Sequence, residues 1–285
     1  MIKNKILITS HSLGEAITKC VIDNQNYFDV PITVVSLQEL ITDYTIFDEL
    51  TDSGSVIRWN KGSDFCISNK DHYLLNRVLY VPNVLFNDFI SHDQEYAQRE
   101  FEAYLGFSFN AFVGVGNKSA KGEIGDVLSL PQQWASIRNK FEINVPNYYW
   151  GPSYRNSLKN MNNVVYSSIY HFMNWSISNS AQVNKHIFCF EKPPGNPVFI
   201  LSIGGKQLIT SNVDLSINME DRLLEIAKQI ALIFNYFISE ILMFVDGDNL
   251  YFGCINHEII RSNKNSSYDQ FVCENLINEF FKCIN

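Results

Sequence analysis

The sequence has no long hydrophobic run. No apolar stretch approaches the roughly 18 residues that a membrane-spanning helix needs. The apolar run near the N-terminus, Ile6 to Ile8, is too short for the core of a secretory signal peptide. We therefore expect no membrane contact and a cytoplasmic location.

Basic residues are in the minority. Lys and Arg number 22 against 30 Asp and Glu, which gives a net charge of -8. The sequence contains no run of Lys and Arg residues. Binding to the phosphate backbone of nucleic acid needs a local concentration of positive charge. We expect no direct binding of nucleic acid.

The six cysteines form no motif. They include no C-x-x-C pair, and no His lies at metal-ligating spacing from them. Cys189 and Cys254 lie in apolar, strand-like runs, where a reduced and buried thiol is the usual state. The sequence predicts no disulfide framework.

Apolar and aromatic residues, by contrast, are plentiful. Hydrophobic residues make up 46% of the chain and charged residues 18%, the balance of a folded globular protein. A chain of 285 residues can form one large domain or several closely packed subdomains. The 21 Phe, 14 Tyr and 4 Trp favour a large aromatic core and leave open an apolar groove or an oligomer contact.

The N-terminal part alternates between strand and helix patterns. A short apolar strand over Lys5–Thr9, a helix carrying Ala16, Ile17 and Val21, and a β-branched strand over Pro31–Leu37 predict a parallel α/β sheet. The further elements expected are a hairpin over 55–67 that turns at Lys61-Gly62, a strand over 74–81, a helix over 93–107, a helix opened by Pro131, and strands over 164–166 and 187–190.

The C-terminal part predicts two glycine-turn hairpins that bracket an amphipathic helix. The Gly204-Gly205 pair suits the positive φ angles of a tight turn. Asn218 and Asp221 resemble the N-terminal cap of the helix. We expect residues 188–285 to form one lobe, an antiparallel sheet with the long helix packed across it. Its elements are a hairpin over 197–210, a helix over 219–237, a hairpin over 240–260 that turns at 246–249, and a closing helix over 268–284.

This order of elements resembles the C-terminal lobe of ATP-grasp ligases. The stretches that carry the resemblance are Pro194–Gly205, Leu224–Ile230 and Asp246–Asn256, the last similar to the family's strand that ends in an asparagine. The resemblance implies an α/β fold, α+β in the C-terminal lobe, with two lobes that enclose a nucleotide cleft. The domains it implies are an N-terminal pre-ATP-grasp-like α/β domain over 1–110, a small central lobe over 111–185, and a C-terminal ATP-grasp-like lobe over 186–285.

The resemblance also implies a chemistry. In these ligases ATP phosphorylates a substrate carboxylate, and an amine or another nucleophile then displaces phosphate from the acylphosphate. Two Mg²⁺ ions bridge the triphosphate and are held by hard oxygen ligands. A lysine and an arginine neutralise phosphate charge. The implied cofactors are therefore ATP and Mg²⁺, and the implied substrate is a small acid or a peptide.

Several positions depart from the family's pattern. Asn256 matches the asparagine ligand, but Cys254 stands where a glutamate is expected, and a thiol is a poor ligand for magnesium. Phe199 occupies the position of a phosphate-binding arginine, and Ser167 that of a nucleotide-binding lysine. These losses put ATP and Mg²⁺ binding in doubt.

Glu240 is the candidate for the first metal carboxylate. A tight turn at Gly247-Asp248 would aim Glu240 and Cys254 at opposite faces of the sheet, because side chains alternate along a strand. A bulge at Gly253 would restore the match. Glu258 is a further candidate ligand. The metal set is thus Glu240, Asn256 and Glu258, and polar residues at a strand end are the alternative interpretation.

Other candidates surround the expected cleft. Glu191 is placed at the adenine hinge, and Lys192 and Lys206 flank the nucleotide cleft, with solvated hairpin lysines as the alternative. Arg261 is the candidate catalytic residue, because its guanidinium could hold a substrate carboxylate bidentately. Arg77 could face substrate or be an ordinary strand-end arginine.

Two functions stay open. The first is an ATP-dependent carboxylate–amine ligase that acts on a small acid or peptide in peptide or natural-product modification. The second is a catalytically silent ATP-grasp-like protein that binds a peptide or a partner subunit. Phe271, Phe280 and Phe281 on the closing helix also predict a homodimer.

Overall fold

The computed structural model describes most of the chain. The described residues are 5–52, 54–116, 128–141, 143–152, 161, 163–170, 172, 186–211, 213–260 and 266–284. Within these residues no helix combines the length and the apolar character that crossing a membrane requires.

A four-stranded parallel sheet forms the N-terminal part, in the order β2-β1-β6-β7. Ile6, Leu7 and Ile8 of β1 are all fully buried, because the strand is central and helices cover its faces. The predicted parallel α/β sheet is confirmed, although β6 ends at Arg77 rather than at Val81. The elements are β1 (Lys5–Ser10), α1 (Ala16–Asp23), a 3₁₀ turn (Gln25–Tyr27), β2 (Ile32–Ser36), α2 (Leu37–Asp43), β6 (His72–Arg77), a 3₁₀ turn (Asn83–Phe86), α3 (Ser91–Ala111) and β7 (Gly114–Gly116).

A small antiparallel meander extends this domain. Its strands β3 (Thr45–Thr51), β4 (Gly54–Lys61) and β5 (Phe65–Ser68) pair in sequence order, so the hairpin around Lys61-Gly62 is confirmed. Trp59 is fully buried and packs against Phe109 and Phe112, at the end of α3.

The central part contains a helix and a three-stranded antiparallel sheet in the order β8-β10-β9. The helix begins at Leu130 with proline in its first turn, as predicted. β10 falls within the predicted 186–285 lobe, yet it pairs with β8 and β9. The elements are α4 (Leu130–Arg138), β8 (Tyr148–Pro152), β9 (Val164–Tyr166) and β10 (His186–Glu191).

The C-terminal sheet is antiparallel, in the order β12-β11-β13-β14, and α5 packs across one face. The predicted sheet and crossing helix are confirmed. The helix is capped by Ser216, whose side chain accepts from the Met219 N–H, rather than by Asn218, and it stops where Asn235 takes a left-handed conformation at φ 54°. The elements are β11 (Asn196–Ile203), β12 (Lys206–Ile209), α5 (Ile217–Phe234), β13 (Ile238–Asp246) and β14 (Asn249–Asn256).

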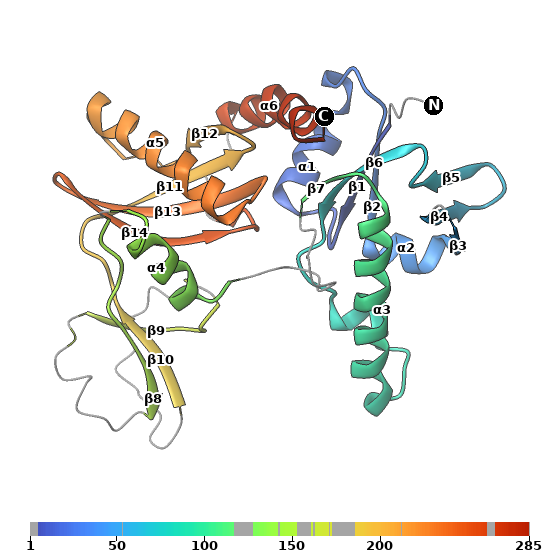
Figure 1. Cartoon of the computed structure of the whole chain (residues 1–285), viewed down its shortest axis with the longest axis horizontal. Helices are drawn as coiled ribbons and strands as arrows, with labels where there is room; N and C mark the ends of the chain where they lie inside the picture. Colours follow the sequence, from blue (N-terminus) through green and yellow to red (C-terminus); the bar gives the residue numbers. More distant parts are fainter. Residues whose placement is uncertain are drawn as a thin grey trace.

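The closing helix α6 (Ser266–Ile284) lies between the N-terminal domain and the C-terminal sheet (Figure 1). Phe280 is fully buried, and its ring meets Tyr73 of β6 and Phe237 of the same chain. Phe271 and Phe281 are partly buried against the same cluster. The phenylalanines that motivated the predicted homodimer therefore pack largely within the chain.

Candidate functional site

A β-bulge sets the register of the strands that carry the candidate metal ligands. Glu240 lies opposite Asn256 and Leu242 opposite Cys254, whereas Met243 lies opposite Phe252. Gly253 is thus the extra residue. Cross-strand partners point to the same face, so Glu240, Asn256 and Cys254 share one face of the sheet. The bulge named from the sequence is present.

Glycine is required at the bulge. A β-carbon on Gly253 would lie 2.8 Å from Cγ of Leu242, closer than two carbons can approach. Two side chains of helix α4 form hydrogen bonds with the backbone of the bulged strand β14. Trp134 Nε1 donates to the Gly253 carbonyl at 2.7 Å, and Gln133 Oε1 accepts from the Ile255 N–H at 2.9 Å.

The face that carries Glu240 and Asn256, here called the ligand face, is mostly apolar. Glu240 is only 2% exposed. Next to Glu240 on this face lies a row of three residues that are paired across β11, β13 and β14, namely Phe199, Leu242 and Cys254. Asn256 Nδ2 contacts the Cys254 sulfur at 3.4 Å.

These residues do not fit a two-ion magnesium site. Mg²⁺ prefers octahedral oxygen coordination, and two ions need several carboxylates. In the part of the chain that the structure describes, no group of three or more His, Cys, Asp or Glu residues lies close enough to hold a metal. Glu240 and Asn256 are side by side, but a thiol and two apolar side chains occupy the adjoining row.

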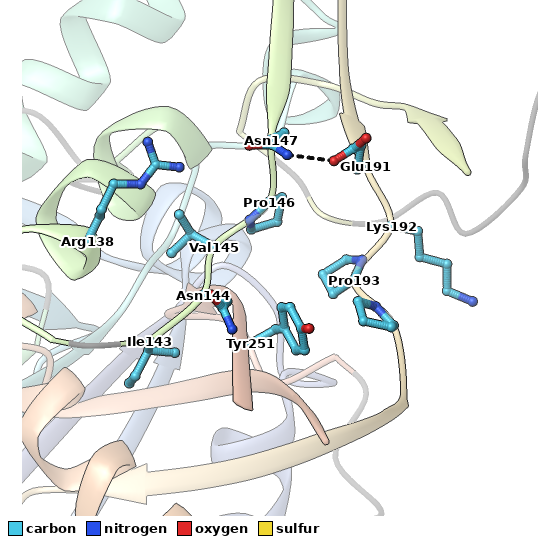
Figure 2. Close-up of a pocket in the computed structure, with 11 residues that line it drawn as sticks. Arg138, Ile143, Asn144, Val145, Pro146, Asn147, Glu191, Lys192, Pro193 and Tyr251 are labelled. Atoms are coloured by element: carbon cyan, nitrogen blue, oxygen red, sulfur yellow. Dashed lines mark hydrogen bonds between the residues drawn. The ribbon is translucent and has the colours of Figure 1, made fainter. Parts of the chain in front are cut away.

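In the hinge between β10 and β11, the backbone N–H groups of Glu191 and Lys192 are already engaged. The Glu191 N–H donates to the Asn147 carbonyl at 2.9 Å, and the Lys192 N–H to the Asn163 carbonyl at 3.0 Å. Asn147 Nδ2 also donates to Glu191 Oε2 at 2.7 Å (Figure 2). Pro193 and Pro194 follow and have no N–H.

Two openings adjoin the hinge. One, of about 400 Å³, is also lined by Arg138, Tyr251 and residues 143–147, and the other, of about 370 Å³, by Asn163 and Gly195. In the close-up of the first opening, Arg138 and Lys192 extend in different directions (Figure 2). Their charges do not converge on one point.

The remaining predicted site residues are dispersed. Lys206 is exposed at the start of β12 and lies opposite Ile203 of β11. Ile203 is seven residues, or about 23 Å, along β11 from Asn196, where this strand leaves the hinge. Lys206 therefore does not flank the opening beside Lys192. Glu258 is half-buried, two residues beyond the end of β14. Arg261 lies outside the described residues.

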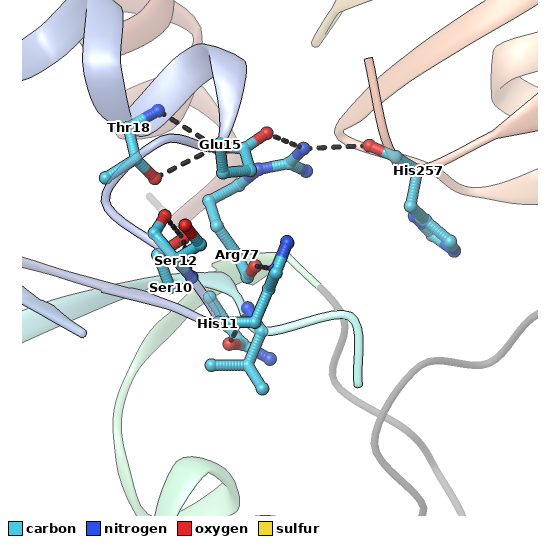
Figure 3. Close-up of polar contacts among 9 residues, drawn as sticks. Ser10, His11, Ser12, Glu15, Thr18, Arg77 and His257 are labelled. Atoms are coloured by element: carbon cyan, nitrogen blue, oxygen red, sulfur yellow. Dashed lines mark hydrogen bonds and ion pairs between the residues drawn. The ribbon is translucent and has the colours of Figure 1, made fainter. Parts of the chain in front are cut away.

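A buried ion pair joins the N-terminal domain to the end of β14. Arg77 Nη2 lies 2.7 Å from Glu15 Oε1 and donates to the His257 carbonyl at 2.8 Å (Figure 3). Glu15 Oε2 accepts from both the N–H and the hydroxyl of Thr18. Arg77 therefore connects two parts of the chain through its side chain.

The pKa of Glu15 lies below its ordinary value. Burial alone would raise it, but the charge of Arg77 and the hydrogen bonds from Arg77 and Thr18 outweigh that effect. The sequence reasoning missed Glu15. Its one signal was its place directly before a predicted helix, where an acid can cap the first turn.

Aromatic rings fill the space between the central sheet and the ligand face. Phe172 lies 4.5 Å from Phe190 of β10 and 6.0 Å from Phe244 of β13, measured between ring centroids. Trp134 of α4 lies 5.4 Å from Phe190. The high aromatic content was the only sequence signal for this cluster.

The chain combines an N-terminal α/β domain, a small three-stranded lobe and a C-terminal antiparallel sheet that a hinge joins to this lobe. Solved structures of ATP-grasp proteins match this arrangement, so the expected fold class is confirmed. No model of a protein family matches the chain, and no curated protein matches its sequence.

Solved structures of peptide-modifying ATP-grasp proteins share the fold over nearly the whole chain. The macrocyclase MdnC of Microcystis aeruginosa MRC, bound with precursor peptide MdnA, superimposes with a TM-score of 0.67 at 15% identity, covering 96% of this chain and 99% of MdnC. The ATP-grasp ligase PsnB, complexed with a minimal precursor, Mg and ADP, has a TM-score of 0.64 at 12% identity, with coverages of 96% and 97%. A RiPP-associated ATP-grasp ligase of Chryseobacterium gregarium, in complex with ADP and a leader and core peptide, has a TM-score of 0.64 at 12% identity and covers 97% of each chain.

Proposed function

We propose that this chain binds a peptide on an ATP-grasp fold and does not catalyse ligation. The observation that carries the second half of this proposal is the apolar row of Phe199, Leu242 and Cys254 beside Glu240 on the ligand face. Transfer of a phosphoryl group needs opposed charges that converge on the phosphates. In the rows of Glu240 and Leu242, the described residues of β11, β13 and β14 supply one buried carboxylate, Glu240, and one amide, Asn256.

The structural neighbours support a peptide as the ligand class. MdnC was solved with a precursor peptide, PsnB with a minimal precursor, and the Chryseobacterium gregarium ligase with a leader and core peptide.

An ATP-dependent carboxylate–amine ligase remains the second candidate. The register of β13 and β14 favours it, since the bulge brings Glu240 opposite Asn256, the two residue types on which a metal-bound nucleotide would depend. This function would require ATP and Mg²⁺, a small acid or peptide substrate, and an acylphosphate intermediate. Arg261 would then be the residue that holds the substrate carboxylate.

A display selection tests the first half of the proposal. The immobilised full chain is used to select from a phage library of random peptides, and each enriched sequence is synthesised and titrated by calorimetry. We expect saturable binding with a dissociation constant near the micromolar range, equivalent to about 8 kcal/mol. A selection that enriches no sequence able to bind in solution would overturn peptide binding.

Phosphate release tests the second half. The chain is incubated with ATP, Mg²⁺ and the selected peptide, and inorganic phosphate is measured. We expect no release above the enzyme-free control. Turnover that depends on the chain and is lost in the Glu240→Gln variant would overturn the absence of ATP chemistry and favour the ligase instead.

The predicted homodimer, cytoplasmic location, partner subunit and domain boundaries stay predictions. Light scattering at micromolar concentration measures the oligomeric state directly. A dimer, if observed, would need a surface other than Phe280 and Phe281, because these two rings pack against Tyr73 and Phe237.

A further inference from the structure

The central sheet and the C-terminal sheet meet through a continuous layer of aromatic rings. Trp134, Phe172, Phe190 and Phe244 come from α4, the segment after β9, β10 and β13. Their exposed fractions are 1%, 3%, 1% and 0%. They belong to one apolar core that includes residues of both sheets. We call these four residues the aromatic wedge.

One ring of the wedge, that of Phe244, lies on the ligand face. Phe244 follows Leu242 and Glu240 at alternate positions of β13, so all three point to the ligand face. Phe172 bridges Phe244 to Phe190 on the opposing sheet. A base inserted between the sheets would have to displace the Phe172 ring, and the apolar surfaces now in contact would lose their packing.

The hinge gives a second, independent observation. Adenine presents an amine donor and ring-nitrogen acceptors along its edge. Among residues 191–194, the N–H groups of Glu191 and Lys192 are engaged by the carbonyls of Asn147 and Asn163, and two prolines supply none. This stretch of hinge therefore offers no free N–H to a ring nitrogen.

We propose that the aromatic wedge takes the place of a nucleotide in joining the two lobes, so that this chain binds its peptide without ATP. The proposal rests on the peptide binding proposed above and adds that the lobes are closed by the chain's own side chains. Since the wedge is covalently part of the chain, closure does not depend on a ligand concentration. The peptide site is then formed in the free protein.

Nucleotide titration gives the first test. The melting temperature of the wild-type chain is measured with ATP and with ADP at millimolar concentration, each with and without Mg²⁺. A ligand at about 100 times its dissociation constant raises the melting temperature by several degrees. We expect no rise, and the same affinity for the display-selected peptide with and without Mg²⁺–ATP. A rise, or a peptide affinity increased tenfold by Mg²⁺–ATP, would overturn the proposal.

Hydrogen–deuterium exchange with wedge variants gives the second test. Phe172→Ala removes the bridging ring, and Phe172→Leu keeps an apolar side chain in case the alanine variant does not fold. Tyr170→Ala, which removes a 47% exposed ring from the same segment, is the matched control. We expect faster exchange in β10 and β13 for the Phe172 variants and no change for the control.

The outcomes separate this inference from the proposed function. Exchange in β10 and β13 that is unchanged in Phe172→Leu and Phe172→Ala would overturn the wedge even if peptide binds. Failure to bind any peptide, with no nucleotide effect and faster exchange in the variants, would overturn peptide binding and leave the wedge intact.

Discussion

Glu15 and Arg77 illustrate how a buried ion pair constrains this molecule. Their side chains are 1% and 2% exposed, so both charges have lost nearly all contact with water. The cost of burying both charges is offset because each partner also forms other hydrogen bonds, Glu15 with Thr18 and Arg77 with the His257 carbonyl. Removing one partner would leave the other charge buried and uncompensated, which is more costly than replacing both.

We expect Glu15→Gln to lower the free energy of unfolding at pH 7 by about 3 kcal/mol. Because the folded pKa of Glu15 is lowered, its contribution is fully present above the unfolded pKa of about 4.5 and is lost as pH falls through the folded pKa. The gap between wild type and variant should therefore be constant from pH 7 to 5 and shrink below that. Urea denaturation from pH 7 to pH 3 measures it.

The exposed Glu100 provides the control for this experiment. Glu100→Gln should change stability by less than about 0.5 kcal/mol across the same pH range. A gap between Glu15→Gln and wild type that does not shrink in acid would contradict the assigned role of the carboxylate.

Cys254 tests the chemistry of the ligand face. Cys254→Glu adds the carboxylate that the resemblance leads one to expect, but at a position that is 1% exposed and adjoins Leu242. We expect the variant to lose about 3 kcal/mol of stability, because a buried acid without a partner carries its full desolvation cost. Thermal melts with and without Mg²⁺–ATP check this.

The exposed Cys66 is the matched control, and Cys66→Glu should be nearly neutral. If Mg²⁺–ATP restored the melting temperature of Cys254→Glu, the added oxygen would be serving as a metal ligand. That result would favour the ligase.

At the scale of elements, local patterns in the sequence predicted most of the C-terminal sheet. Gly204-Gly205 and the 246–249 turn placed both hairpins, and apolar spacing placed α5. The errors lie at boundaries. Ser216 rather than Asn218 caps α5, and either residue type can serve, so the sequence alone does not discriminate between them.

The candidate site was less predictable because its character depends on contacts distant in sequence. The register argument identified Gly253 as the place for a bulge, and it is there. Glu240 is 2% exposed, and Phe172 contacts Phe244. Both features depend on segments that are dozens of positions apart in the sequence. No periodicity in one segment reports on such contacts.

The bulge itself makes a testable claim. Gly253→Ala should lower the free energy of unfolding by about 2 kcal/mol, because the new methyl group would overlap Leu242 in a packed core. Gly205→Ala is the control, since a β-carbon there meets no atom within 4 Å. If Gly253→Ala and Gly205→Ala lowered the free energy of unfolding equally in urea denaturation, the close approach of Leu242 would not be the reason that position 253 requires glycine.

At the scale of the whole molecule, α6 makes the N-terminal domain and the C-terminal sheet share one core. A single apolar cluster contains Ile8 of β1, Ile17 of α1, Leu201 of β11 and Leu276 of α6. The buried pair of Arg77 and Glu15, with its bond to the His257 carbonyl, adds a polar connection across the same boundary. Neither part can lose its structure without exposing apolar surface of the other.

We therefore expect the N-terminal domain and the C-terminal sheet to unfold in one transition. Differential scanning calorimetry should show a single peak for both, and Leu276→Ala should move that peak as a whole. Leu276 is fully buried in the shared cluster, so truncating it should cost about 3 kcal/mol. Leu232→Ala, at a 66% exposed position of α5, is the control and should leave the peak in place. Two resolved peaks, of which Leu276→Ala shifts only one, would mean that α6 stabilises only one of the two parts and does not join them.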